Sequence, residues 1–256
     1  MESAPSTWGL GAAIFWIRGT SHVLAYTSPV FGSNAIGTAL VPRDGQISTS
    51  SPAKNRWYTS VSTGRPVLTD VYQRFFAGEE VEIWPSRGTN AVPIAFDPNT
   101  GLVYASTWDV PRIQKIAAPR PQVLGADSTG ITARIPDVKP GDVLGHFVAL
   151  NPITGQKKWE VPLTDLPGSA GMLATGGGLL FTGKLTGEFV ALDTATGKTL
   201  WQFQTGSSIN ATAITYTHNG RQYVSVASGR GGVLANRYAA AKVPAGGSVW
   251  TFALMP

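Results

Sequence analysis

One fifteen-residue pattern occurs twice in this chain and limits what the chain can fold into. Residues 145–159 read GHFVALNPITGQKKW, and residues 187–201, which lie 42 positions later, read GEFVALDTATGKTLW. Each copy contains an apolar run, a polar segment with Gly, and a second run that begins near Trp. Asp and Asn can bond their own backbone in a turn, and Gly adopts the positive φ of a tight reversal. Each copy therefore predicts strand, turn and strand.

The spacing of the two copies indicates the fold class. A period near 40 residues with several short strands per repeat is typical of β-propellers, in which each repeat forms one blade. Further strands are predicted at residues 81–84, 95–104, 177–183, 212–217, 222–227 and 249–254. An Asn219-Gly220 turn joins two of these strands as a hairpin. The sequence therefore predicts an all-β fold with about three to four blades.

The rest of the chain is less regular. Residues 1–40 predict an irregular N-terminal segment that supplies part of a blade, and residues 41–256 predict the blades themselves. Gly64 and Pro66 predict a loop near residues 62–66. Residues 107–143 are rich in Pro and predict a long insertion. That insertion either covers a blade edge as a surface excursion or forms a lid or partner-binding surface.

Composition excludes several classes of protein. The chain has 256 residues, of which 43% are hydrophobic and 14% charged, as in globular proteins. It has no Cys, so it has neither disulfides nor thiolate metal sites. The net charge of +5 is dispersed rather than gathered in a basic stripe, which argues against nucleic acid as a partner. We find no apolar run long enough for a membrane span and recognise no signal peptide.

The repeated motif resembles that of a known family. Ala191, Asp193, Gly197 and Trp201 are similar to the tryptophan-docking motif of the quinoprotein alcohol and methanol dehydrogenases, which use pyrroloquinoline quinone (PQQ). Six further motifs follow in the order of the C-terminal half of that family, at residues 63–66, 88–93, 99–104, 171–178, 215–224 and 229–232. The resemblance covers residues 41–254. It implies a partial propeller from an eight-bladed ring.

The resemblance also implies an activity. Family members oxidise a primary alcohol and pass electrons to a c-type cytochrome in the periplasm. Their Ca²⁺ or lanthanide ion polarises the quinone, while a carboxylate base takes the alcohol proton. The expected partners are therefore a small alcohol and a c-type cytochrome.

Five residues correspond to cofactor-facing positions of the family. The resemblance assigns cofactor contacts to Asn90, Ser169, Gly231 and Gly232. Arg230 stands where the family has Trp in a Gly-Trp-Gly-Gly loop. Its guanidinium could bind a quinone carboxylate with two hydrogen bonds. The alternative is that Arg230 is an exposed loop residue.

Other family residues have no counterpart in this sequence. Ala91 stands where the family often has Trp, and no Lys precedes Lys54, where a quinone-binding Lys is expected. The catalytic Asp and the metal ligands are not found either, so the sequence predicts a chain that is incomplete alone or that a second chain completes. The alternative function is a non-catalytic propeller scaffold that binds a protein partner.

The polar residues of the repeats are interpreted as structural. Asp97 and Asp193 occupy turn positions, where their carboxylates bond the backbone. His146 and His218 share no metal-ligand spacing, and we expect both to face solvent.

Overall fold

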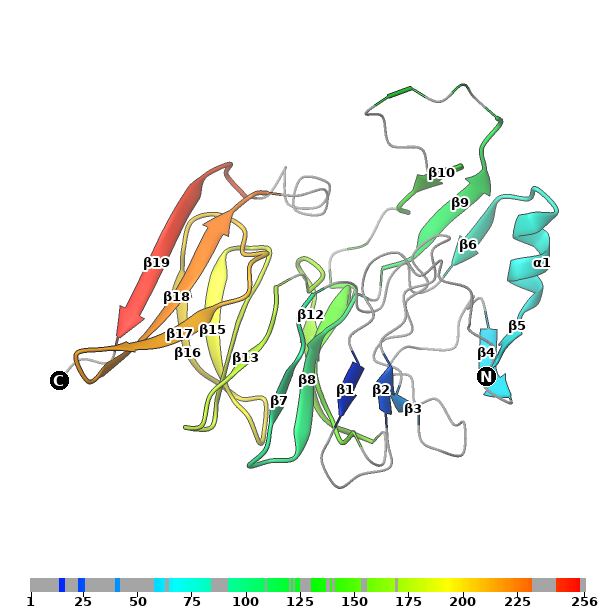
Figure 1. The fold of residues 1–256 in the computed structure, drawn as a ribbon. Helices are drawn as coiled ribbons and strands as arrows, with labels where there is room; N and C mark the ends of the chain where they lie inside the picture. Colours follow the sequence, from blue (N-terminus) through cyan, green and yellow to red (C-terminus); the bar gives the residue numbers. More distant parts are fainter. Residues whose placement is uncertain are drawn as a thin grey trace. The chain divides into compact units, whose positions relative to one another are not determined.

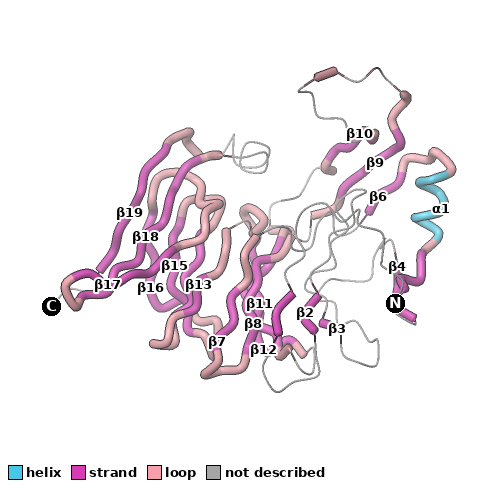
Figure 2. The backbone as a smooth tube through the Cα atoms, in the orientation of Figure 1, coloured by secondary structure: helices cyan, strands magenta, loops and turns pink. Residues whose placement is uncertain are grey.

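In the part of the chain that the structure describes, short antiparallel strands dominate the fold, together with one helix (Figure 1, Figure 2). The computed structural model describes the backbone of five strands before residue 69, and the residues in the following ranges in full: 69–83, 92–108, 110–119, 121, 123–124, 130–136, 139, 141–152, 156–168, 170–231 and 243–253. The chain divides into two compact units, namely residues 1–91 with 109–139, and residues 92–108 with 140–256. Both copies of the sequence repeat lie in the second unit.

Three antiparallel sheets, which we call the first, second and third blades, make up the second unit. Within each blade the strands lie in chain order. The first blade contains β7 (Ala95–Asp97), β8 (Leu102–Ser106), β11 (Gly145–Leu150) and β12 (Lys157–Leu163). The second contains β13 (Leu173–Ala174), β14 (Leu179–Gly183), β15 (Glu188–Asp193) and β16 (Thr199–Gln204). The third contains β17 (Ile214–His218), β18 (Arg221–Gly229) and β19 (Gly247–Ala253).

The two copies of the repeat form corresponding strand pairs in successive blades. Ala149 lies opposite Trp159 in the first blade, and Ala191 lies opposite Trp201 in the second. The register shifts at the next residue in both pairs, before Leu150 and before Leu192. The repeat in the sequence is therefore a repeat in the structure, down to the position of the irregularity.

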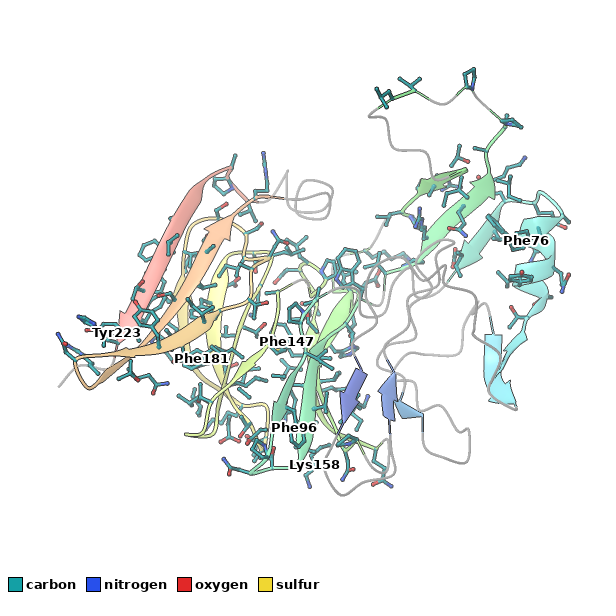
Figure 3. All side chains as sticks on the ribbon, viewed as in Figure 1. Phe76, Phe96, Phe147, Lys158, Phe181 and Tyr223 are labelled. Carbon is teal, nitrogen blue, oxygen red and sulfur yellow. The ribbon has the colours of Figure 1, made fainter. Side chains whose placement is uncertain are left out.

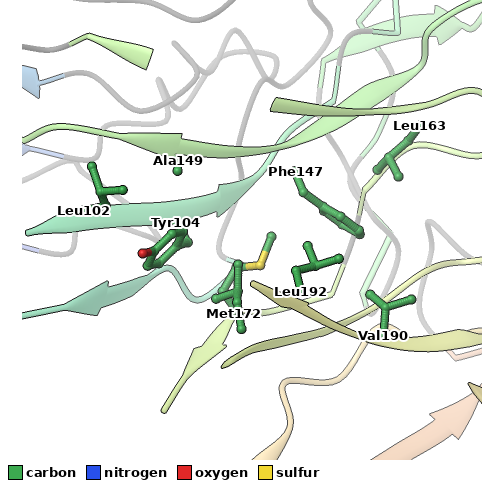
Figure 4. Packing of buried hydrophobic residues seen from close by; sticks show 9 residues of the cluster. Leu102, Tyr104, Phe147, Ala149, Leu163, Met172, Val190 and Leu192 are labelled. Carbon is green, nitrogen blue, oxygen red and sulfur yellow. The ribbon is translucent and has the colours of Figure 1, made fainter. Parts of the chain in front are cut away.

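The central strand β15 packs on both of its faces because successive side chains of a strand point to opposite sides. Val190 and Leu192 join Phe147 and Tyr104 in the core between the first and second blades (Figure 4). Phe189 faces the other way, into a core shared with the third blade. Figure 3 shows Phe147 and Phe181 among the side chains of the blades. Fully burying one such aromatic side chain contributes about 2–3 kcal/mol.

The hairpin of the third blade has the turn that its sequence predicts. Asn219 has φ +49° and Gly220 has φ +74°, and these two residues connect β17 to β18. Two successive positive φ values are the requirement of the two-residue hairpin turn that Asn-Gly favours.

The first unit contains shorter sheets and the helix. One sheet contains β1 (Ile14–Trp16), β2 (Val23–Ala25) and β3 (Leu40–Val41), and a hairpin contains β4 (Tyr58–Ser62) and β5 (Arg65–Leu68). Helix α1 (Asp70–Phe76) precedes a third sheet of β6 (Val81–Ile83), β9 (Arg112–Ile116) and β10 (Ile131–Arg134). Val71 and Phe75 of the helix pack against Val81 and Ile83. Within the described residues, no helix is long and apolar enough to cross a membrane.

Two predicted loops contain strands instead. The loop predicted near residues 62–66 is a hairpin in which Pro66 lies opposite Val61. Pro is tolerated there because a two-stranded hairpin leaves an open edge that needs no N–H donor. In the predicted insertion, β9 pairs with both β10 and β6, and Gln114 lies opposite Val81. The Pro content of the insertion suggested a long loop, but its prolines lie outside β9 and β10, so they remove no hydrogen bond from these strands.

Candidate functional site

The longer connections of the second unit gather at one end of the blades. Because the strands alternate in direction, the tight turns at residues 98–101, 194–198 and 219–220 lie at one end. The connection between the second and third blades, residues 205–213, and the end of β18 lie at the opposite end. Functional residues are most often found on such connections, which a rigid sheet positions.

Two of the five predicted cofactor residues belong to this end of the described chain. Arg230 and Gly231 directly follow β18. Asn90, Ser169 and Gly232 lie outside the described residues. We call residues 229–231 the arginine turn.

Arg230 is held against the protein and is not an exposed loop residue. Its side chain is half-buried, and Nη1 donates a hydrogen bond to the carbonyl oxygen of Val243 at 3.2 Å. Val243 itself is buried beside Leu166 and Leu185. The guanidinium therefore lies at a defined place, where its charge is less screened than it would be in water.

Gly231, the next residue in the chain, is exposed. Its N–H bonds the carbonyl of Gly229 at 2.8 Å, which closes a three-residue turn. A Cβ built on Gly231 would meet no atom of the described residues within 4 Å. A flat group can therefore approach this backbone closely, which is one use of Gly at binding sites.

A network of buried hydroxyl groups lies next to the arginine turn, between residues 205–208 and the end of β18. Thr205 Oγ1 and Ser228 Oγ lie 2.7 Å apart and share a hydrogen bond, and each lies 3.0 Å from the carbonyl oxygen of Ser207. The N–H of Gly229 bonds the carbonyl of Ser208 at 2.7 Å. This network fastens the connection between the second and third blades to the end of β18. Sequence reasoning missed it, although the cluster of small polar residues at 205–210 was a visible signal.

The arginine turn fits the quinone implied by the family resemblance. PQQ is flat and carries carboxylates, and a guanidinium is the side chain best suited to bind a carboxylate. Arg230 would supply the positive charge, and Gly231 would leave room for the ring system. The fit rests on this charge and this open backbone.

The carboxylates predicted to act in turns do so. Asp97 is 2% exposed, and its Oδ1 accepts the N–H of Asn99 at 2.9 Å. Asp193 Oδ1 accepts the N–H of Thr196 at 2.8 Å. The Thr196 hydroxyl, which also donates to this carboxylate, is the main cause of the lowered pKa of Asp193. Both residues therefore stabilise turns.

The two histidines differ in their surroundings. His218 is exposed, as expected. The expectation for His146 was wrong, because its ring is half-buried with Nε2 3.8 Å from Glu160 Oε2. Glu160 lies on the neighbouring strand, and pairing within the sheet brings the two side chains together. No group of three His, Asp or Glu residues gathers as metal ligands in the part of the chain that the structure describes.

Known proteins resemble this chain in sequence and in fold. Residues 144–224 match the PQQ family model, described as the β-propeller domain of glucose, ethanol and alcohol dehydrogenases. Quinohemoprotein alcohol dehydrogenase ADH IIB of Pseudomonas putida is 33% identical over 192 residues, which cover 73% of this chain and 27% of that protein. The lanthanide-dependent methanol dehydrogenase of Methylorubrum extorquens is 34% identical over 221 residues, which cover 79% of this chain and 36% of that protein. The chain belongs to the quinoprotein alcohol dehydrogenase family.

A solved structure of a quinoprotein extends the likeness to the fold. The crystal structure of the quinohemoprotein alcohol dehydrogenase from Comamonas testosteroni matches with a TM-score of 0.73 and 25% identity, over 94% of this chain and 37% of that one. The predicted family and the all-β propeller fold are confirmed. The chain spans 27–36% of the length of the two quinoprotein relatives compared above.

Proposed function

We propose that this chain supplies blades that bind pyrroloquinoline quinone in a PQQ-dependent alcohol dehydrogenase. The observation that carries the proposal is the arginine turn, where the half-buried Arg230 is held by Val243 and is followed in the chain by the exposed Gly231. The names of the relatives, an alcohol dehydrogenase and a methanol dehydrogenase, support a primary alcohol as the substrate. By family resemblance, we place the activity in the periplasm, with a c-type cytochrome as the electron acceptor.

Each residue of the arginine turn has a defined task in this proposal. Arg230 neutralises a carboxylate of the cofactor and fixes its orientation through paired N–H donors. Gly231 permits close approach because it has no Cβ. Asn90, Ser169 and Gly232 are proposed as further contacts on the strength of the family motifs. When bound, the quinone would supply the hydride-accepting chemistry of alcohol oxidation, and a Ca²⁺ or lanthanide ion would serve as the Lewis acid.

The family's catalytic carboxylate and metal ligands have no motif in this sequence, so we propose that residues outside these 256 supply them. The contribution of the described blades is then binding and orientation. Holding a cofactor in its reactive geometry is itself a large part of catalysis.

Titration with quinone tests the proposal. The chain is titrated with PQQ in the presence of Ca²⁺ or La³⁺, and binding is followed by the absorbance of the quinone. Saturable binding is expected, and Arg230→Gln weakens it by about tenfold or more, as for loss of a charge-assisted hydrogen bond. The matched control is Arg221→Gln, which removes an arginine from the other end of β18 and leaves the affinity unchanged.

Three outcomes would count against the proposal or one of its parts. Absence of saturable binding contradicts it and favours the non-catalytic scaffold. Equal effects of the two arginine variants show that Arg230 makes no cofactor contact. Dye-linked oxidation of a primary alcohol by these 256 residues alone would contradict the assignment of the catalytic carboxylate and the metal ligands to residues outside them.

A further inference from the structure

The side chain of Asn210 joins the connection between the second and third blades to the arginine turn. Its Nδ2 lies 3.5 Å from the carbonyl oxygen of Gly229 and 3.2 Å from that of Gly231. An amide NH₂ group has two N–H donors, so it can serve both carbonyls. Asn210 thereby bridges the two residues on either side of Arg230.

The arginine turn needs such a contact because of its sequence. Gly229 and Gly231 have the widest backbone freedom of any residue type, so the chain itself does little to direct Arg230. Two backbone bonds limit these glycines, from Gly229 N–H to Ser208 and from Gly231 N–H to Gly229. Asn210 contacts the carbonyls of both glycines.

We propose that Asn210 is a positioning residue for the quinone. It holds Gly229 and Gly231 so that the Arg230 guanidinium and the open Gly231 backbone keep one arrangement before the cofactor arrives. This inference rests on the proposed function, because the turn is positioned for that ligand. A preformed site binds more tightly than a mobile one, since less conformational freedom is lost on binding.

A positioning role can be separated from a purely structural one. Thr205, Ser207 and Ser228 are buried, so their network contributes to the stability of the blades. Asn210 is only half-buried. Loss of the Asn210 N–H donors should therefore increase the mobility of the arginine turn clearly. It should lower the free energy of unfolding of the whole chain only slightly.

Three variants form the test. Asn210→Asp keeps the size of the side chain but removes the N–H donors. Asn210→Ala is measured beside it, because Asp also places a negative charge near two carbonyl oxygens. The matched control is Ser225→Ala, which loses a 2.8 Å contact between Ser225 Oγ and Thr251 Oγ1 in the same blade but away from the turn.

Three measurements are made on each variant: quinone affinity, amide hydrogen exchange at residues 229–231, and the midpoint of urea unfolding. Both Asn210 variants are expected to bind quinone about tenfold more weakly, as for loss of one to two hydrogen bonds. They exchange faster at residues 229–231, and their unfolding midpoints shift no more than that of Ser225→Ala. The control keeps the affinity and the exchange rates of the wild type.

The outcomes distinguish the inference from the proposed function. Wild-type exchange rates at residues 229–231 in both Asn210 variants overturn the inference, because Asn210 then does not hold the turn. Faster exchange with unchanged affinity also overturns it, because the position of the turn then does not matter to the quinone. Absence of quinone binding by the wild type overturns the proposed function and the quinone part of the inference, while the exchange comparison still decides whether Asn210 holds the turn.

Discussion

Trp159 of the first blade packs against Gly197 of the second. The indole Nε1 donates a hydrogen bond to the carbonyl of Thr194 at 3.0 Å, and a Cβ on Gly197 would lie 2.6 Å from ring atom Cε3. The last residue of one repeat copy therefore rests on the turn of the next copy. Trp201, the corresponding residue of the second copy, instead makes an edge contact with Phe252 of the third blade at 5.0 Å and is 39% exposed.

Gly197→Ala tests this contact. We expect a loss of about 3 kcal/mol, because Ala at φ +74° costs roughly 1–2 kcal/mol and overlap with the indole adds to it. Gly220→Ala is the matched control, since Gly220 has the same φ of +74° but no atom within 4 Å of its Cβ position. The control should lose only about 1 kcal/mol. Equal losses in urea unfolding would show that the indole contact adds nothing.

Trp159 and Tyr104 should be energetically coupled. Tyr104 OH also donates to the carbonyl of Thr194, at 3.0 Å, so this carbonyl accepts from both side chains. Trp159→Phe and Tyr104→Phe should each cost about 1 kcal/mol, and the double variant should cost about 1 kcal/mol more than their sum. The double-mutant cycle is measured by urea unfolding. The pair Trp201→Phe with Tyr104→Phe is expected to be additive, and additivity in both cycles would contradict the shared acceptor.

Acid should destabilise the turn of the second copy. Hydrogen bonds from the side chain and the backbone of Thr196 lower the pKa of Asp193 below its ordinary value of 3.8. A lowered pKa in the folded state contributes stability above the unfolded value, and that stability is lost as pH falls through the folded value. Asp193→Asn should therefore reduce the dependence of unfolding free energy on pH below about pH 4.

The first copy suggests that Asn is tolerated at this turn position, because Asn151 occupies it there. The measurement is urea unfolding between pH 2.5 and 6 for both proteins. If the free energy of unfolding depends on pH equally in wild type and variant, the Asp193 carboxylate contributes nothing to the acid sensitivity of folding. Asp142→Asn, which changes another acidic residue of the same unit, is the control.

Gly231→Ala should separate binding from stability. The Cβ would enter open space, so the free energy of unfolding should change by less than about 0.5 kcal/mol. Quinone affinity should fall by about tenfold, because the added methyl group occupies the surface that the ring system approaches. Gly206→Ala serves as the comparison. It should lower the free energy of unfolding, because Gly206 has a φ of +85°, but it should leave the quinone affinity unchanged, because Gly206 lies outside the arginine turn. If Gly231→Ala binds the quinone with unchanged affinity, Gly231 is not part of the binding site.

Much of the fold was predictable because the signals are local. The apolar run, turn residue and Gly of each copy specify strand, turn and strand whatever surrounds them. The Asn219-Gly220 hairpin is equally local, since positive φ at two successive positions is a property of those residue types. At residues 62–66 the turn signal correctly excluded a central strand, but it missed that Arg65 and Pro66 belong to β5, because pairing between strands depends on a partner segment as well as on Pro and Gly.

The candidate site was predictable only in part. The family motif pointed to Arg230 and Gly231, but it did not reveal that Val243 holds the guanidinium or that Asn210 bridges the turn. Those partners lie 13 and 21 residues away in the sequence, so folding alone brings them together. No local pattern marks them.

The first glycine of each repeat copy shows what the sequence determines and what only the tertiary structure explains. The sequence by itself determined that residues 145 and 187 are both Gly and that each opens a strand–turn–strand unit. Only the tertiary structure decided why. A Cβ on Gly145 would lie 2.1 Å from the carbonyl oxygen of Thr107, and a Cβ on Gly187, which also adopts a φ of +98°, would lie 2.7 Å from the carbonyl oxygen of Ser207. Local conformation is encoded by residue type, but close approach depends on what the rest of the chain places beside it.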